Sequence, residues 1–141
     1  MIKVLQLAFL RASPALALCL LRLWLGGSML LLHGWGKLSH FAETAAKFSD
    51  PLGVGGHVSL ALAVFAEVLC AALLVLGLFT RLAALVLAVE MAVAFTVVHG
   101  HVLTGAHSGE LAFLYLAGFV ALFLGGGGCC SVDGRMGGKS A

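Results

Sequence analysis

Three ionisable residues, Arg22, Glu67 and Glu90, each lie near the middle of a different long apolar stretch of this chain. A charged side chain at the centre of a bilayer costs roughly 2.5 to 3.5 kcal/mol even on the milder insertion scale, so such groups are normally paired inside a helix bundle. One arginine can neutralise only one carboxylate. We therefore expect Arg22 to pair with Glu67 and Glu90 to be protonated. Such a set could bind a polar ligand or pass protons.

The depths of these residues allow them to meet. Each lies eight to ten residues from the nearer predicted end of its stretch, which places it about 12 to 15 Å deep at the helical rise of 1.5 Å per residue. A second interpretation is structural, because a buried ion pair can fix the packing and register of helices without any chemistry. The sequence leaves both interpretations open.

The composition is that of an integral membrane protein. Hydrophobic residues make up 62% of the chain and charged residues only 10%, and the mean hydropathy is +1.13. Soluble domains are about 45 to 50% apolar, whereas a spanning helix needs about 20 apolar residues. The sequence predicts one all-α membrane domain over residues 1–141, an antiparallel four-helix bundle in the lipid bilayer, with spans at about 14–35, 57–79, 82–98 and 111–127.

The positions of the basic residues predict the orientation. Five fall at one end of the predicted bundle, namely Lys3, Arg11, Arg81, Arg135 and Lys139, against Lys37 and Lys47 at the other. By the positive-inside rule, this asymmetry places both termini of a multi-pass cell (inner) membrane protein in the cytoplasm. The basic residues are scattered rather than clustered, so we expect no nucleic-acid partner.

The connections between the spans differ. In the first outer loop, apolar residues recur at helical spacing before Asp50 and Pro51 break the pattern, which predicts a short helix in the outer interface. That segment is either a plain connector or a lid over the mouth of the bundle. After the fourth span, Gly125 to Gly128 end the helix, and we expect the tail 131–141 to be disordered.

A group of histidines and charged residues falls on the outer side. Imidazole is a common metal ligand, but the spacing here matches no tight ligand motif, so we assign no metal site. A metal or haem site and a pH-responsive mouth remain alternative interpretations. The residues of this predicted outer mouth are His33, Lys37, His57, His99, His101 and Glu110.

The four cysteines fall into two groups. Cys19 and Cys70 lie within spans and are most simply small packing residues. The adjacent Cys129 and Cys130 follow the fourth span on the predicted cytoplasmic side, where disulfides are rare unless catalytic or redox-sensing. Packing or palmitoylation at the membrane edge is the alternative to thiol redox chemistry.

Segments from about Leu20 to Asp133 resemble DoxX-type proteins. The resemblance is carried by Leu21-Arg22-Leu23, Gly26-Gly27, His33-Gly34-Trp35-Gly36-Lys37-Leu38, Glu67, Leu76-Gly77-Leu78-Phe79-Thr80-Arg81, Gly109-Glu110-Leu111-Ala112-Phe113-Leu114-Tyr115-Leu116, Gly125 to Gly128, Ser131 and Asp133. It implies a four-helix membrane bundle with motif positions at Arg22, Lys37, Glu67, Arg81 and Glu110. Relatives implied by it include a subunit of thiosulfate:quinone oxidoreductase and a partner in membrane-associated thiol and superoxide defence complexes.

Two classes of function follow. In the first, the protein is a subunit of a redox complex whose buried Arg22, Glu67 and Glu90 bind a quinone or small oxidant and handle protons. A soluble or membrane redox partner would supply the electrons, because no cofactor motif is visible in the chain, and copies of the chain could also assemble together. In the second class, the protein is a non-enzymatic module that binds or transports a small solute. The substrate is not defined by the sequence.

Overall fold

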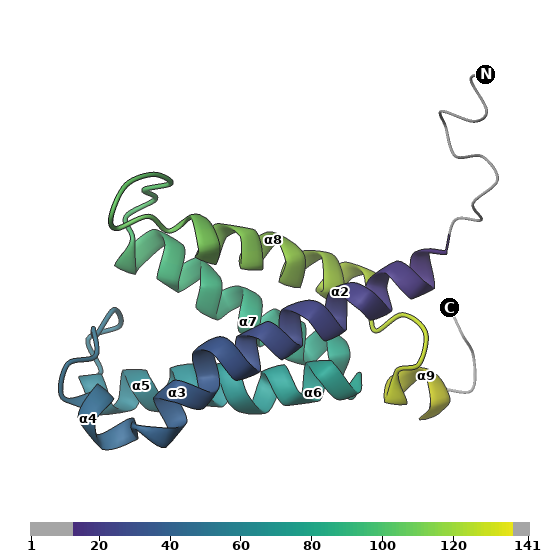
Figure 1. The fold of residues 1–141 in the computed structure, drawn as a ribbon, viewed down its shortest axis with the longest axis horizontal. Helices are drawn as coiled ribbons and strands as arrows, with labels where there is room; N and C mark the ends of the chain where they lie inside the picture. The colour runs from purple at the N-terminus through teal and green to yellow at the C-terminus, as the bar shows by residue number, and fades with distance from the viewer. Residues whose placement is uncertain (1–12, 137–141) are drawn as a thin grey trace.

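The computed structural model describes residues 13–136, and every regular element in that range is helical. Four long helical runs form the bundle, with the chain ends of the described part near the same end of it (Figure 1). The elements are α2 (Pro14–Ser28), η1 (Met29–Gly34), α3 (Trp35–Ser39), α4 (Phe41–Ala45), α5 (Gly56–Val64), η2 (Phe65–Cys70), α6 (Ala71–Leu76), α7 (Thr80–Val93), η3 (Ala94–Val98), α8 (Glu110–Gly125) and α9 (Val132–Met136).

Three of these runs are long and apolar enough to cross a membrane, namely Pro14–Ser39, Gly56–Leu76 and Thr80–Val98. The fourth, α8, is apolar but has only 16 residues. Trp24 is 80% exposed and Leu32 is 76% exposed, as expected of side chains that face lipid acyl chains rather than water. The predicted helical membrane bundle is confirmed.

The ends of the runs follow local sequence signals. Pro14 occupies the first turn of α2, and the Ser13 hydroxyl accepts a hydrogen bond from the Leu16 N–H at 3.4 Å. The run continues to Ser39 instead of ending near residue 35, because Gly34 and Trp35 keep helical backbone angles. A glycine inside a helix costs only about 1 kcal/mol relative to alanine, which packing can offset.

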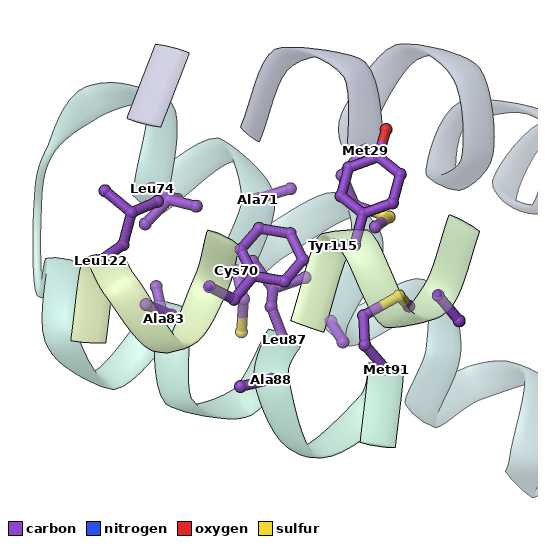
Figure 2. Close-up of a cluster of buried hydrophobic side chains, with 14 residues drawn as sticks. Met29, Cys70, Ala71, Leu74, Ala83, Leu87, Ala88, Met91, Tyr115 and Leu122 are labelled. Atoms are coloured by element: carbon purple, nitrogen blue, oxygen red, sulfur yellow. The ribbon is translucent and has the colours of Figure 1, made fainter. Parts of the chain in front are cut away.

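Small side chains allow the helices to approach closely. Ala83, Ala84 and Ala88 of α7 are buried, and α7 packs most extensively against α8, where Phe119 and Leu122 are fully buried. Figure 2 shows this core, in which Leu74, Cys70 and Met29 from other runs complete the cluster. Association inside a membrane depends on such close packing, because lipid provides no hydrophobic force between helices.

Each of the three long runs contains a π-helical segment, which lies inside the first and second runs and at the end of the third. These segments are η1, η2 and η3, and their wider turns shift the helical faces by inserting an extra residue. The π geometry is uncommon and frequently occurs at functional sites. Here η2 contains the buried Glu67, so this segment is a candidate for part of a functional site.

The two ends of the bundle are built differently. One end carries α3, α4, the 46–55 loop and the loop between η3 and α8, whereas the other carries the start of α2, the α6–α7 turn and α9 (Figure 1). The predicted short helix of the first outer loop is present as α4.

The prediction of a disordered tail over residues 131–141 is wrong for its first part. Ser131 is buried and α9 follows it, while residues 137–141 lie outside the described range. The reason is a cap: the Asp133 carboxylate accepts hydrogen bonds from the N–H groups of Phe79 and Thr80, both at 2.8 Å. These donors open α7 and have no partner inside the helix, so Asp133 supplies one from a distance.

Candidate functional site

A cavity of about 450 Å³ lies between the second and third helical runs, below the 48–52 segment of the first loop. Its wall is mainly apolar, with three ionisable side chains among the lining residues: Lys37, Glu67 and Glu90. A mostly apolar cavity of this size with a few polar groups is the usual form of a small-molecule site. The apolar lining residues include Phe48, Leu52, Leu62, Ala63, Phe65, Ala66, Val86, Val89, Met91, Val93, Ala94 and Val98.

Lys37 and Glu67 form an ion pair at the cavity wall. The Glu67 side chain is only 4% exposed, whereas that of Lys37 is 27% exposed and reaches in from α3. The approach depends on Gly34, because a Cβ at that position would lie 2.6 Å from the Glu67 carbonyl oxygen. Gly34 therefore lets the first run cross the π-helical turn that carries Glu67.

Glu90 lies beside this pair on α7. Its carboxyl group lies near the Glu67 carboxyl group and the Lys37 ammonium group, both of which influence its charge. Glu67 Oε2 and Glu90 Oε2 are both buried, and neither has a hydrogen-bond donor among residues 13–136. Buried polar atoms without a partner are rare in folded proteins and call for an explanation such as a proton or a ligand.

The cavity is not closed on all sides. Leu62, Phe65 and Val89 line it and are each about half exposed, at 50%, 49% and 57%. These residues lie within the apolar runs, so the open side of the cavity lies at bilayer depth rather than only at the water-facing end. An apolar molecule could therefore reach the cavity directly from the lipid.

The segment that covers the cavity is held by Asp50. This carboxylate accepts hydrogen bonds from the Ser59 hydroxyl at 2.7 Å, the Gly55 N–H at 2.7 Å and the Val54 N–H at 3.0 Å. These bonds, led by the one from Ser59, hold the pKa of Asp50 below its ordinary value. The loop is thus anchored to the start of α5 while its Phe48 and Leu52 line the cavity.

The prediction that Arg22 pairs with Glu67 or Glu90 is wrong. The Arg22 guanidinium donates to backbone carbonyls instead: Nε to Gly127 at 3.1 Å, and Nη1 to both Leu74 and Val75. Leu74 lies seven residues beyond Glu67 in the second run, roughly 10 Å along the helix. Arg22 is 1% exposed. Its guanidinium donates to carbonyls in the last turn of α6, which lack the partners they would have inside a helix, and the Leu74 carbonyl also accepts from the Gly77 N–H at 3.0 Å. Lys37 takes the place predicted for Arg22.

The outer histidines do not converge. His33 packs edge-on against Tyr115 with ring centroids 5.7 Å apart, and His101 packs in the same way against Phe95 at 5.4 Å. His99 Nδ1 lies 3.0 Å from the His107 carbonyl oxygen, and His57 is exposed at the start of α5. No group of three or more His, Cys, Asp or Glu side chains within residues 13–136 is placed to hold a metal ion. Glu110, at the start of α8, is exposed and does not line the cavity.

Two parts of the arrangement were missed by sequence reasoning. Lys37 was placed in the outer mouth because the first span was expected to end at residue 35, two residues before it. Continuing the helical spacing from His33 through Lys37 would have put both on one face of a longer helix. Asp133 was one residue of the recognised family pattern, but nothing in its local sequence indicated a distant cap.

An all-helical membrane bundle with a charged cavity at one end defines the class of this protein. A model of the DoxX family matches residues 17–100, which is more than half of the chain and includes Lys37, Glu67 and Glu90. An uncharacterised protein of Haemophilus influenzae is 38% identical over 113 residues, which cover 77% of this chain and 82% of the relative. No solved structure matches the chain significantly. The chain belongs to the DoxX family.

Proposed function

We propose that this protein is a membrane subunit that binds a quinone, or a similarly lipid-soluble oxidant, in the cavity between the second and third runs. The observation that carries the proposal is the pair of buried oxygens, Glu67 Oε2 and Glu90 Oε2, which lack donors among the described residues and lie at an apolar cavity. A ligand with an apolar body and a small polar head matches both properties of this wall.

The three charged groups have distinct roles in this proposal. Lys37 neutralises one carboxylate, so one proton shared by Glu67 and Glu90 leaves the set without net charge at a depth where charge is costly. Lys37 also offers a donor to a carbonyl oxygen of the ligand. Because Lys37 is partly exposed, it connects the buried carboxyls to the end of the bundle that carries α4.

Reduction of a quinone takes up two protons and two electrons. Glu67 and Glu90 are the groups in the cavity wall that can hold and release protons at the ligand, and electrons would come from a soluble or membrane redox partner. In this account the protein supplies the binding site and the protons, and the complex as a whole carries out the redox reaction.

A binding experiment tests the proposal. The purified full-length protein in lipid nanodiscs is titrated with a short-chain benzoquinone and with its hydroquinone, and heat of binding is measured by calorimetry. We expect saturable binding of the wild type, weakened by Glu67→Gln and by Glu90→Gln. Glu43→Gln is the matched control, because Glu43 lies exposed on α4 outside the cavity.

Three results are distinguishable. Loss of binding in the two cavity variants but not in the control supports the proposal. Equal binding by all four proteins would contradict the assignment of the cavity, because partition into lipid does not depend on these side chains. Saturable binding of a redox-inactive analogue with the same affinity, together with no proton uptake on quinone reduction, would favour the second class of function, a non-enzymatic small-solute module.

We further propose that both chain ends face the cytoplasm of a cell (inner) membrane. Arg81 and Arg135 lie at the end of the bundle with the α6–α7 turn and α9, whereas Lys37 and Lys47 lie at the opposite end. In a variant whose native cysteines are replaced by serine, Arg135→Cys should resist a membrane-impermeant maleimide on intact cells, and Lys47→Cys should react. The reverse pattern would overturn the orientation.

A further inference from the structure

Three of the four cysteines gather at the end of the bundle opposite the charged cavity. Cys19 is buried on α2, Cys129 is half-buried and Cys130 is exposed, and all three are free thiols. The Cys129 thiol lies near the thiols of both Cys19 and Cys130. The fourth, Cys70, is buried in the apolar core instead.

Backbone contacts place Cys129 on the face of α2 that carries Cys19. The Cys129 N–H donates to the Ala15 carbonyl at 2.9 Å, and Ala15 lies one helical turn before Cys19. The preceding residue is a glycine of necessity: a Cβ at Gly128 would lie 2.3 Å from the Ala15 oxygen and 2.7 Å from the Cys19 nitrogen. The segment is therefore pressed against this turn of the helix.

Arg22 of α2 contacts both segments that meet here, the one before Cys129 and the turn of α2 that carries Cys19. Its Nε donates to the Gly127 carbonyl at 3.1 Å, and its Nη2 lies 3.8 Å from Cys19 Sγ. A cavity of about 810 Å³ at this end is lined by Cys129 and Cys130, so a small reagent can reach the thiols from outside. The arrangement has a buried thiol, an accessible thiol next to it and a route of entry.

We propose that Cys19 and Cys129 form a reversible dithiol–disulfide pair, oxidised by a small hydroperoxide, that fastens the C-terminal segment to α2. This site is independent of the proposed quinone cavity. The Cys129 thiolate attacks the O–O bond, forming a sulfenic acid and releasing water or an alcohol. The Cys19 sulfur then attacks the sulfenic sulfur, and the sulfenic hydroxyl leaves as water with the Cys19 proton; the Cys129 proton has gone to the water or alcohol released in the first step. The two thiols have lost two electrons to the hydroperoxide and two protons in total. A dithiol reductant reverses the reaction.

The surroundings of Cys129 affect the rate. Burial and the neighbouring thiols of Cys19 and Cys130 raise the pKa of Cys129 above its ordinary value. Because only the thiolate attacks, we expect oxidation to be slow at neutral pH and to accelerate about tenfold per pH unit while the thiol is mostly protonated. The pair would then respond to sustained rather than brief oxidant exposure.

Peptide mapping tests the pairing. The full-length protein in detergent micelles is treated with hydrogen peroxide, free thiols are alkylated, and non-reduced peptides are analysed by mass spectrometry. We expect a peptide that links Cys19 to Cys129, loss of two of the four alkylatable thiols, and full recovery after dithiothreitol. A bond only between Cys129 and Cys130, an intermolecular bond through Cys130, or irreversible acids without a cross-link would each overturn the proposal.

Matched variants identify the sulfur atoms. Cys130→Ser and Cys70→Ser should retain the intramolecular cross-link, whereas Cys129→Ser and Cys19→Ala should lose it. A Cys129→Ser protein that still cross-links Cys19, through Cys130, would overturn the assignment. Oxidation should also raise the thermal unfolding midpoint of the wild type and of Cys130→Ser but not of Cys129→Ser, because a bond between residues this far apart in the sequence restricts the unfolded chain. A rise of the same size in Cys129→Ser would contradict it.

Discussion

Two cations of this bundle, Arg22 and Lys37, lie in different kinds of site. Arg22 is almost wholly buried, and its donors reach carbonyls of the α6 terminus and of Gly127. Lys37 is partly exposed and binds one of two neighbouring carboxyls, leaving an oxygen of each without a donor among residues 13–136. The first site is complete within the protein, whereas the second has hydrogen-bonding capacity left over.

That difference is the one expected between a structural charge and a charge that binds a ligand. A buried charge whose hydrogen bonds are all satisfied stabilises a packing arrangement and offers nothing to a ligand. A set of carboxyls with free acceptors beside an apolar cavity is costly for the empty protein and gains most when a ligand or a proton arrives. The sequence prediction was based on burial alone, which does not distinguish a charge with satisfied hydrogen bonds from carboxyls with free acceptors.

The largest expected effect is that of Arg22→Leu. It removes the side-chain donor of the Val75 and Gly127 carbonyls and leaves the Leu74 carbonyl with the Gly77 N–H alone, so we expect a loss of unfolding free energy on the order of 3 kcal/mol. Unfolding followed by intrinsic fluorescence in mild detergent measures it. Arg81→Leu is the control, because Arg81 is exposed and, within the described part of the chain, donates only to the Leu124 carbonyl, so this variant should lose much less stability. Similar losses in both variants would contradict a structural role for the Arg22 hydrogen bonds.

Glu67→Gln tests the other site. We expect the affinity for a short-chain quinone to fall about tenfold, equivalent to about 1.4 kcal/mol, while the unfolding midpoint changes little because Lys37 can turn toward solvent. Calorimetric titration and thermal unfolding of the same preparation separate the two effects. A large loss of stability with unchanged affinity would mean that the Lys37–Glu67 pair is structural in the way that Arg22 is.

Asp133→Ala removes the cap of α7 and should cost about 1 kcal/mol of unfolding free energy at neutral pH. Partial burial alone would raise the pKa of Asp133, but the hydrogen bonds from Thr80 and Phe79 outweigh it and hold the pKa below its ordinary value of 3.8. The stabilisation is therefore full above that value and is lost as pH falls through the lower, folded-state pKa. Unfolding midpoints from neutral to acid pH should show the gap between wild type and variant closing; a constant gap would contradict the cap.

The smallest effect is expected for Ser59→Ala. The variant removes one donor to Asp50 and loosens the 48–52 segment, so quinone affinity should fall only a few-fold and stability should hardly change. Ser49→Ala is the comparison, since Ser49 lies on the same segment of the cavity wall but makes no hydrogen bond to Asp50 among the described residues. Equal affinities for wild type and Ser59→Ala would show that the segment does not shape the site.

The sequence defined the bundle better than it defined the site. Apolar runs and their breaks indicated the helices within a few residues, because lipid imposes a length and a polarity on every span. The partner of Glu67 was not predictable in this way. Whether Arg22 or Lys37 reaches it depends on the crossing at Gly34 and on the extension of the first run to Ser39, both of which are tertiary features. Asp133 likewise acts more than fifty residues from its donors.

The most direct measurement is photoaffinity labelling with a short-chain quinone that carries a photoreactive group, applied to the protein in lipid nanodiscs. We expect labels on cavity residues such as Phe65, Met91 and Val93. Excess unlabelled quinone should suppress this labelling, and it should be reduced in Glu67→Gln and Glu90→Gln but not in Glu43→Gln. Labels spread over lipid-facing residues such as Trp24 and Leu32, insensitive to competitor and to these substitutions, would contradict the proposed quinone site.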